Sequence, residues 1–142
     1  MGKFAINFGL SFLVYLVAIF LVFPIVLILR FINVDPFSIW QDIALWLHVL
    51  ISATLFFFLG TRLNLLDNHL LDFLSACGGL AFGLYMMLLG SYALILPQFS
   101  FGVIAALIVE NTNYNLYLAI TVVSILPALI TWLGMVYKSR QA

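Results

Sequence analysis

The stretch "IALWLHVLISATLFFFLG", residues Ile43–Gly60, decides the fold class of this chain. It contains no charged residue and approaches the length of about 20 apolar residues that a transmembrane helix needs. One ionisable residue, His48, stands inside it. An imidazole surrounded by hydrocarbon needs a hydrogen-bond partner, so His48 has either a structural partner or a function inside the membrane.

Composition extends this interpretation to the whole chain. Of its 142 residues, 66% are hydrophobic and only 7% are charged. A chain with so few charged residues cannot cover the surface of a water-soluble domain with polar side chains. The formal net charge is zero, so the chain offers no basic face for nucleic-acid phosphates, and we expect no nucleic-acid partner. The single cysteine, Cys77, excludes an internal disulfide.

Charge-free intervals predict an all-α fold, a four-helix transmembrane bundle in one domain over residues 1–142. The predicted spans are residues 5–31, 40–60, 71–96 and 116–137. Pro97 ends the third span because proline lacks a backbone N–H and disfavours helix in the residue before it. The apolar piece 99–109 is too short to cross, and we expect an interfacial or re-entrant segment on the outer face.

Basic residues predict the orientation of the bundle, because Lys and Arg near helix ends concentrate on the cytoplasmic side. With both termini in the cytoplasm, four basic residues lie on that side and only Arg30 lies outside; the four are Lys3, Arg62, Lys138 and Arg140. The first apolar run is too long for a cleaved signal peptide, so it reads as a retained helix. Short loops without an N-glycosylation sequon favour a multi-pass protein of the cell membrane, in a bacterial inner membrane.

Two helix starts carry capping signals. Ser38, with Gln41 three residues later, matches a capping box at the start of the predicted span 40–60. Asp67 or Asn68 can cap the helix that follows, because a short polar side chain accepts a hydrogen bond from the free N–H groups of a first turn.

Small residues recur at helical spacing in the third predicted span, within "SACGGLAFGLYMMLLG". Ser75, Gly79 and Gly83 are four residues apart, and Gly90 returns to the same face seven residues later. Small residues at this spacing let two helices approach closely in lipid. We expect this face to pack inside the bundle; a homodimer seam or a contact with a larger membrane protein is the alternative.

Counting residues from each helix centre places a candidate polar layer around His48. Tyr85 and Ser124 fall near the depth of His48, and Tyr15 lies just inward of it. Hydroxyl groups at this depth can hydrogen-bond a neutral imidazole, which would make the layer a structural link between helices. The alternative is a proton or small-solute path, because ionisable groups inside membranes mark such paths.

A second polar cluster is predicted at the cytoplasmic ends of the second and third spans, formed by Arg62, Asp67, His69 and Asp72. His69 and Asp72 are three residues apart and can touch on one helix face. We interpret the cluster as a charged, capped surface loop. The alternative is a lipid-modifying enzyme, with His69 as general base and Arg62 on a phosphate.

The sequence carries no cofactor-binding motif, and its His and Cys residues have no metal-ligand spacing. We therefore expect no catalytic residue, no cofactor and no metal. The resulting hypothesis is a non-enzymatic accessory or regulatory subunit that packs in the membrane against itself or a larger membrane partner, with lipids around it. The alternative is a small oligomeric transporter or channel with the His48 layer lining its path.

Overall fold

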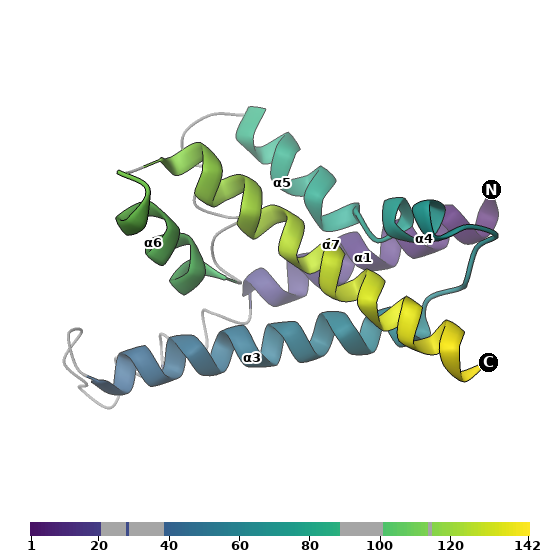
Figure 1. The fold of residues 1–142 in the computed structure, drawn as a ribbon, viewed down its shortest axis with the longest axis horizontal. Coiled ribbons are helices and arrows are strands. Elements are labelled where there is room, and N and C mark those ends of the chain that lie inside the picture. Colours follow the sequence, from purple (N-terminus) through teal and green to yellow (C-terminus); the bar gives the residue numbers. More distant parts are fainter. Residues whose placement is uncertain (21–27, 29–38, 89–100, 114) are drawn as a thin grey trace.

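The computed structural model describes residues 1–20, 28, 39–88, 101–113 and 115–142. This part of the chain is all-helical and without strands, which confirms the all-α part of the prediction. Its helices are α1 (Gly2–Phe20), α3 (Ile39–Arg62), α4 (His69–Ser75), α5 (Gly78–Leu88), α6 (Gly102–Asn111) and α7 (Leu116–Gln141) (Figure 1).

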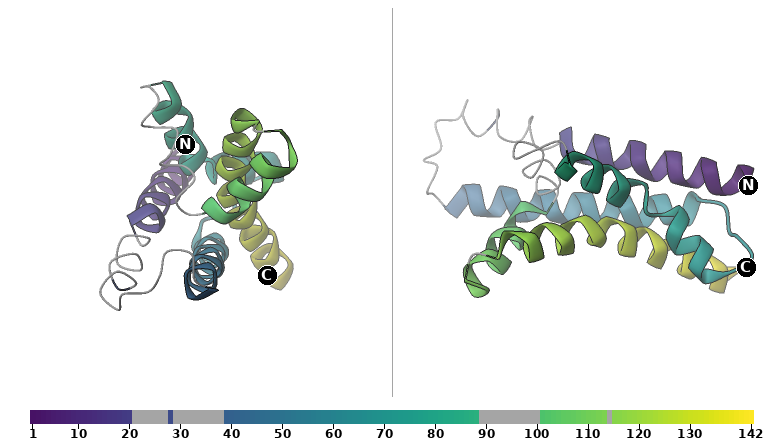
Figure 2. Two further views of the ribbon diagram at one scale, coloured as in Figure 1. Left: turned by 90° about the vertical axis from the view of Figure 1, so that its left-hand side faces the viewer. Right: turned by 90° about the horizontal axis from the view of Figure 1, so that it is seen from above.

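The helices form an elongated bundle in which α7 contacts every other described helix. Both termini lie at one end of the bundle, together with the end of α3 and the start of α4 (Figures 1 and 2). The chain therefore runs up and down: α1 and then α4–α5 lead away from this end, and α3 and α7 return to it. We call it the terminal end.

Length and hydropathy single out one helical stretch of the described residues that is able to cross a membrane, Thr121–Gln141, with a mean hydropathy of 1.5. Gly2–Ala18 and Trp46–Arg62 are apolar helical stretches of shorter length. Parts of the predicted spans 5–31 and 71–96 lie outside the described residues. Four membrane crossings therefore stay a prediction.

The predicted third span, residues 71–96, differs from the structure, where α4 ends at Ser75 and α5 begins at Gly78. The N–H of Cys77 donates to the carbonyl three residues earlier, at 3.2 Å, which is the tight pattern that often ends an α-helix. The N–H of Gly78 then donates to the hydroxyl of Ser11 on α1, at 3.0 Å, instead of continuing the helix. At the break, a side-chain hydroxyl from a neighbouring helix thus accepts the hydrogen bond that a helix carbonyl would otherwise accept.

The helix α6 overlaps the short segment predicted at 99–109. Phe101, directly before it, is only 1% exposed, and its ring centroid lies 6.3 Å from that of Phe56 in α3. The helix contacts α7 and α3 and lies alongside the first part of α7. One end of this segment therefore reaches the interior of the bundle.

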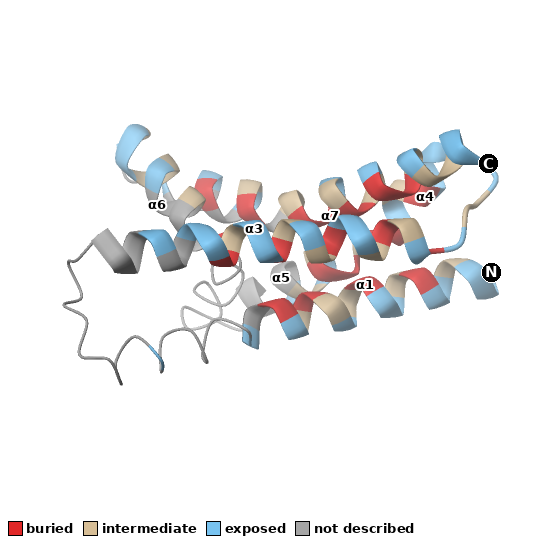
Figure 3. Cartoon of the chain, turned by 90° about the horizontal axis from the view of Figure 1, so that it is seen from below, coloured by how far each residue is buried: buried red, intermediate tan, exposed pale blue. Residues whose placement is uncertain are grey.

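The interior combines aromatic and small side chains from α1, α3 and α7 with Phe101; its buried members are Tyr15, Ala18, Phe56, Phe101, Ala119 and Val123. Figure 3 shows the buried positions as stripes along the helices, separated by exposed stripes. The exposed stripes carry large apolar residues: Leu13 is 55% exposed, Leu50 64% and Leu133 51%. Apolar side chains thus occupy the outside of the bundle as well as its interior.

Two glycines form the crossing of α3 and α7. A Cβ atom built on Gly134 would lie 3.0 Å from the Cα of Gly60 and still closer to the carbonyl oxygen of Phe57. A Cβ on Gly60 would lie 2.9 Å from the Cα of Gly134. Because neither position has room for a side chain, the two backbones touch here.

The start of α4 is capped by Asn68, one of the two predicted candidates. Its side-chain Oδ1 accepts hydrogen bonds from the N–H of Leu70 at 2.5 Å and from that of Leu71 at 3.4 Å. Asp67, the other candidate, is exposed. The cap fixes where α4 begins after the loop that follows α3.

Asn68→Ala is expected to lower the free energy of unfolding by about 1 kcal/mol, because the first N–H groups of α4 lose their acceptor. Asp67→Ala is the matched control and should change that free energy by less than about 0.5 kcal/mol. Unfolding by SDS titration in mixed micelles measures both values. Equal losses in the two variants would contradict the assignment of the cap.

Candidate functional site

Seven polar or charged side chains are buried in the described part of the chain. They are Asn7, Ser11, His48, Ser52, Asp72, Ser75 and Thr131. A buried polar group is costly unless it is hydrogen-bonded, so its partners show what it does in the fold. Most of these side chains lie in two places, around α4 at the terminal end and in the middle of α3.

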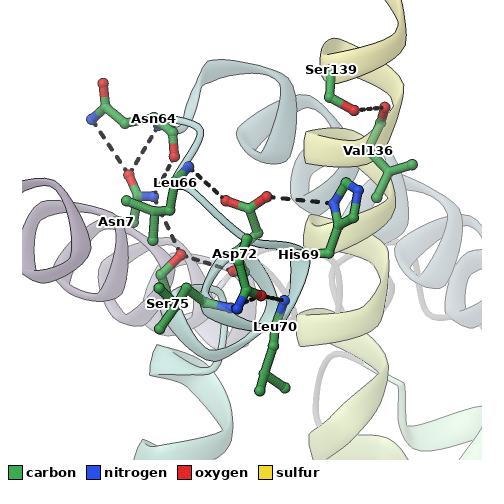
Figure 4. Close-up of polar contacts among 11 residues, drawn as sticks. Asn7, Asn64, Leu66, His69, Leu70, Asp72, Ser75, Val136 and Ser139 are labelled. Atoms are coloured by element: carbon green, nitrogen blue, oxygen red, sulfur yellow. Dashed lines mark hydrogen bonds and ion pairs between the residues drawn. The ribbon is translucent and has the colours of Figure 1, made fainter.

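Asn7 is the centre of the first group (Figure 4). Its amide Nδ2 donates to the carbonyl oxygen of Asn64 at 2.8 Å and to the hydroxyl of Ser75 at 3.3 Å. Its Oδ1 accepts a hydrogen bond from the N–H of Asn64 at 3.0 Å. One side chain of α1 therefore fastens the loop after α3 and the helix α4 to the same place.

Asp72 holds the same loop from the other side (Figure 4). Its Oδ1 accepts a hydrogen bond from the N–H of Leu66 at 2.8 Å. Its Oδ2 lies 3.8 Å from Nδ1 of His69, which is longer than a hydrogen bond. The Asp72 side chain is 5% exposed and that of His69 is 70% exposed. The carboxylate is therefore buried, and the imidazole lies on its outer side.

The predicted cytoplasmic cluster is brought together only in part. A cavity of about 130 Å³ is lined by Asp67, His69 and Asp72, along with Asn68, Ser139, Leu65 and Leu66. Arg62 does not line this cavity: its guanidinium lies over the ring of Phe58, 5.0 Å from the centroid. The basic residue that a lipid-phosphate reaction would need is therefore turned along α3.

His48 lies in the interior, where its Nε2 is 3.3 Å from the carbonyl oxygen of Ala18 on α1. A carbonyl only accepts, so this hydrogen bond places the proton on Nε2. Ser52 follows one turn later on α3, and its hydroxyl is buried without a hydrogen-bond partner in the described part of the chain. His48 thus joins α3 to α1, and the buried hydroxyl of Ser52 lies one turn away on the same helix.

The three hydroxyl groups predicted around His48 fall in different places. Tyr15 is fully buried in the core, with its ring centroid 6.3 Å from that of Phe56. Tyr85 is 59% exposed, so it points away from the interior that holds His48. The side chain of Ser124 lies outside the described residues. Counting residues along a helix does not tell which way a side chain faces, and Tyr85 faces outward.

The small-residue face packs on α1 where it is described. Ser75 is fully buried and receives the hydrogen bond from Asn7. A Cβ on Gly79 would lie 2.6 Å from the ring of Tyr15, so this glycine lets α5 and α1 approach closely. The surroundings of Gly83, and Gly90 itself, lie outside the described residues.

Sequence reasoning missed Asn7, Ser11 and Asn64. The signal was present for two of them, since Asn7 and Ser11 are four residues apart and share a helix face with Tyr15. Asn64 gave no signal, because its part in the contact is mainly its backbone N–H and carbonyl group.

No protein-family model matches this chain, and no characterised protein or solved structure is detectably similar to it.

Proposed function

We propose that this chain is a multi-pass protein of the cell membrane, a four-helix bundle with both termini in the cytoplasm. The observation that carries the proposal is the distribution of side chains on α1. Asn7, Ser11 and Tyr15 are buried, whereas Leu10 and Leu13 on the other face are exposed. In water this arrangement would be reversed, because burying apolar surface drives folding there. In lipid it is favourable, since polar groups find partners only inside the bundle.

Helix dimensions support the same proposal. A crossing needs about 20 residues, and α1, α3 and α7 have 19, 24 and 26. The helices α4 and α5 follow one another in a fourth rod. The segment with α6 would be re-entrant, because Phe101 before it is buried in the core.

Charge supports a cytoplasmic terminal end. Four of the five basic residues belong to helix ends or termini that lie there, namely Lys3, Arg62, Lys138 and Arg140. Such an excess of Lys and Arg is typical of the cytoplasmic side.

Within the membrane we propose a non-enzymatic accessory or regulatory subunit, which assembles with itself or with a larger membrane protein. The buried polar side chains support this role, because Asn7, Asp72 and His48 form hydrogen bonds between parts of the same chain. Such contacts stabilise a rigid bundle and need no substrate.

Gentle extraction into lipid particles formed directly from the native membrane tests the proposal. We expect the chain to be recovered in a complex of fixed stoichiometry, with copies of itself or with one larger membrane protein, when its mass is measured. Recovery as a single chain, at every concentration of the polymer that forms the lipid particles, would contradict the role as a subunit.

The hydroxyl of Ser52 favours a second candidate, a small oligomeric transporter with His48 and Ser52 on its path. This hydroxyl is buried and has no hydrogen-bond partner in the described part of the chain, one turn from His48. A hydroxyl and an imidazole in that arrangement could receive a small hydrogen-bonding solute or a proton.

Two substitutions separate these candidates. For a subunit, His48→Phe should cost about 1 kcal/mol of folding free energy through its lost contact with Ala18, and Ser52→Ala should cost less than about 0.5 kcal/mol. For a transporter, both should abolish flux. Proton flux into proteoliposomes is followed with an entrapped pH-sensitive dye. For a subunit, we expect the unchanged protein, His48→Phe and Ser52→Ala all to give the flux of empty liposomes. Flux in the unchanged protein that His48→Phe removes would establish the transporter instead.

A further inference from the structure

An apolar groove runs along the outer side of α3. Its volume is about 490 Å³, and it is lined by Leu47, Leu50, Ile51, Thr54, Leu55 and Phe58. The one polar group among them is satisfied within the helix, because the hydroxyl of Thr54 donates to the carbonyl of Leu50 at 2.8 Å. The groove therefore offers only hydrocarbon to an occupant.

The length of the groove fits one leaflet of a bilayer. Leu47 and Phe58 are separated along α3 by about 16 Å, at about 1.5 Å per residue. The hydrocarbon core of a membrane is about 30 Å thick, so the groove spans about half of it. One further turn of helix leads from Phe58 to Arg62, which would then lie at the level of the lipid headgroups.

One positive charge, that of Arg62, lies at this end of the groove. The guanidinium of Arg62 lies over the ring of Phe58, which also lines the groove, at 5.0 Å from the centroid. The carbonyl of the next residue, Leu63, accepts a hydrogen bond from Nζ of Lys138 at 2.6 Å. Lys138 of α7 therefore reaches the main chain at the end of α3, one residue beyond Arg62.

Arg62 has no carboxylate within ion-pair distance among the described residues. The buried carboxylate of Asp72 accepts a hydrogen bond from the N–H of Leu66 and lies 3.8 Å from Nδ1 of His69. Positive charge at the mouth of a hydrocarbon groove is complementary to a lipid that carries a negative headgroup. Arginine in particular pairs with phosphate through two parallel N–H groups.

We propose that this groove and Arg62 bind one anionic phospholipid, with an acyl chain along α3 and the phosphate at Arg62. The inference rests on the proposed membrane insertion and adds a lipid class and a site to it. Such a site would tie the protein to the anionic inner leaflet at the terminal end.

Lipid binding to the full-length protein tests the site. The protein in mild detergent is titrated with phosphatidylglycerol or phosphatidylcholine of identical acyl chains, and bound lipid is counted by native mass spectrometry. We expect phosphatidylglycerol to bind about fivefold more tightly, the effect of one basic residue at an anionic surface. Arg62→Gln should remove this preference, and Arg62→Lys should retain part of it.

Two further variants separate the groove from general attraction. Lys3→Gln removes the same charge at the same end of the bundle, on α1, and should leave the preference within twofold of its original value. Ile51→Trp fills the groove and should weaken binding of both lipids. Equal losses for Arg62→Gln and Lys3→Gln, or unchanged binding by Ile51→Trp, would overturn the proposed site.

Alkaline carbonate extraction distinguishes this inference from the proposed function. A chain that stays in the membrane at high pH but shows no preference for phosphatidylglycerol would remove the lipid site and leave membrane insertion standing. A chain released by carbonate would overturn both.

Discussion

Replacing Gly134 by leucine is expected to lower the free energy of unfolding by about 3 kcal/mol, at the upper end of what overpacking costs. The reason is the backbone contact between α3 and α7, where a Cβ on Gly134 would lie 3.0 Å from the Cα of Gly60. The neighbouring atoms belong to the main chain, so no side chain can rotate away. Helix α7 contacts all other described helices, and a shift of α7 away from α3 disturbs the whole bundle. SDS titration in mixed micelles measures the loss.

Gly9→Ala is the matched control for this prediction. Gly9 lies on α1, and a Cβ added there would meet no atom within 4 Å. Alanine is a better helix former than glycine by up to about 1 kcal/mol, so this variant should be as stable as the original protein or more stable. If Gly134→Leu were also neutral, α3 and α7 would not cross at these glycines.

Asn7→Leu is expected to lower the free energy of unfolding by about 2 kcal/mol, although leucine is the more apolar residue. Asn7 is fully buried and hydrogen-bonds both the N–H and the carbonyl of Asn64, as well as the hydroxyl of Ser75. Its removal leaves partners unpaired, at a cost of about 1–3 kcal/mol for each buried group. The same titration detects the loss.

Asn111→Ala provides the comparison at the opposite end of the bundle. Asn111 is exposed, and its side chain donates only to the carbonyl of Leu107 in its own helix, at 2.8 Å. We expect a change of less than about 0.5 kcal/mol. A gain in stability for Asn7→Leu would mean that α1 presents a different face to α4 and to the loop after α3.

The all-helical class of the chain could be predicted from composition, because long apolar runs without charge leave helices as the simplest way to satisfy the backbone. The faces of the helices could not be predicted from apolar periodicity. Along α1, Leu13 is exposed and Val14 packs against the core, so apolar residues occupy both faces. The small and polar residues mark the interior instead: Asn7, Ser11 and Tyr15 recur every four residues.

The hydrogen-bond partner of His48 could not be predicted from the sequence, for a different reason. Its bond goes to the backbone carbonyl of Ala18, a group that every residue carries, so residue type alone does not identify it. The hydroxyl of Tyr85 had the right chemistry, but the side chain is exposed. Depth along a helix follows from counting residues, whereas orientation depends on how two helices pack.

The predicted cluster of Arg62, Asp67, His69 and Asp72 shows the same limit. The two members three residues apart on one helix, His69 and Asp72, do face each other. Arg62 belongs to another helix and turns to Phe58, four residues earlier on α3. Local spacing therefore predicted the contact within a helix and failed for the contact between elements.

Side-specific labelling tests most directly whether the bundle crosses the membrane with its terminal end in the cytoplasm. In a Cys77→Ser background, Asp67→Cys lies in the loop at the terminal end and Asn111→Cys at the opposite end. We predict that a membrane-impermeant maleimide labels Asp67→Cys only in inside-out vesicles and Asn111→Cys only in right-side-out vesicles. Labelling of both positions from the same side of sealed vesicles would contradict the account.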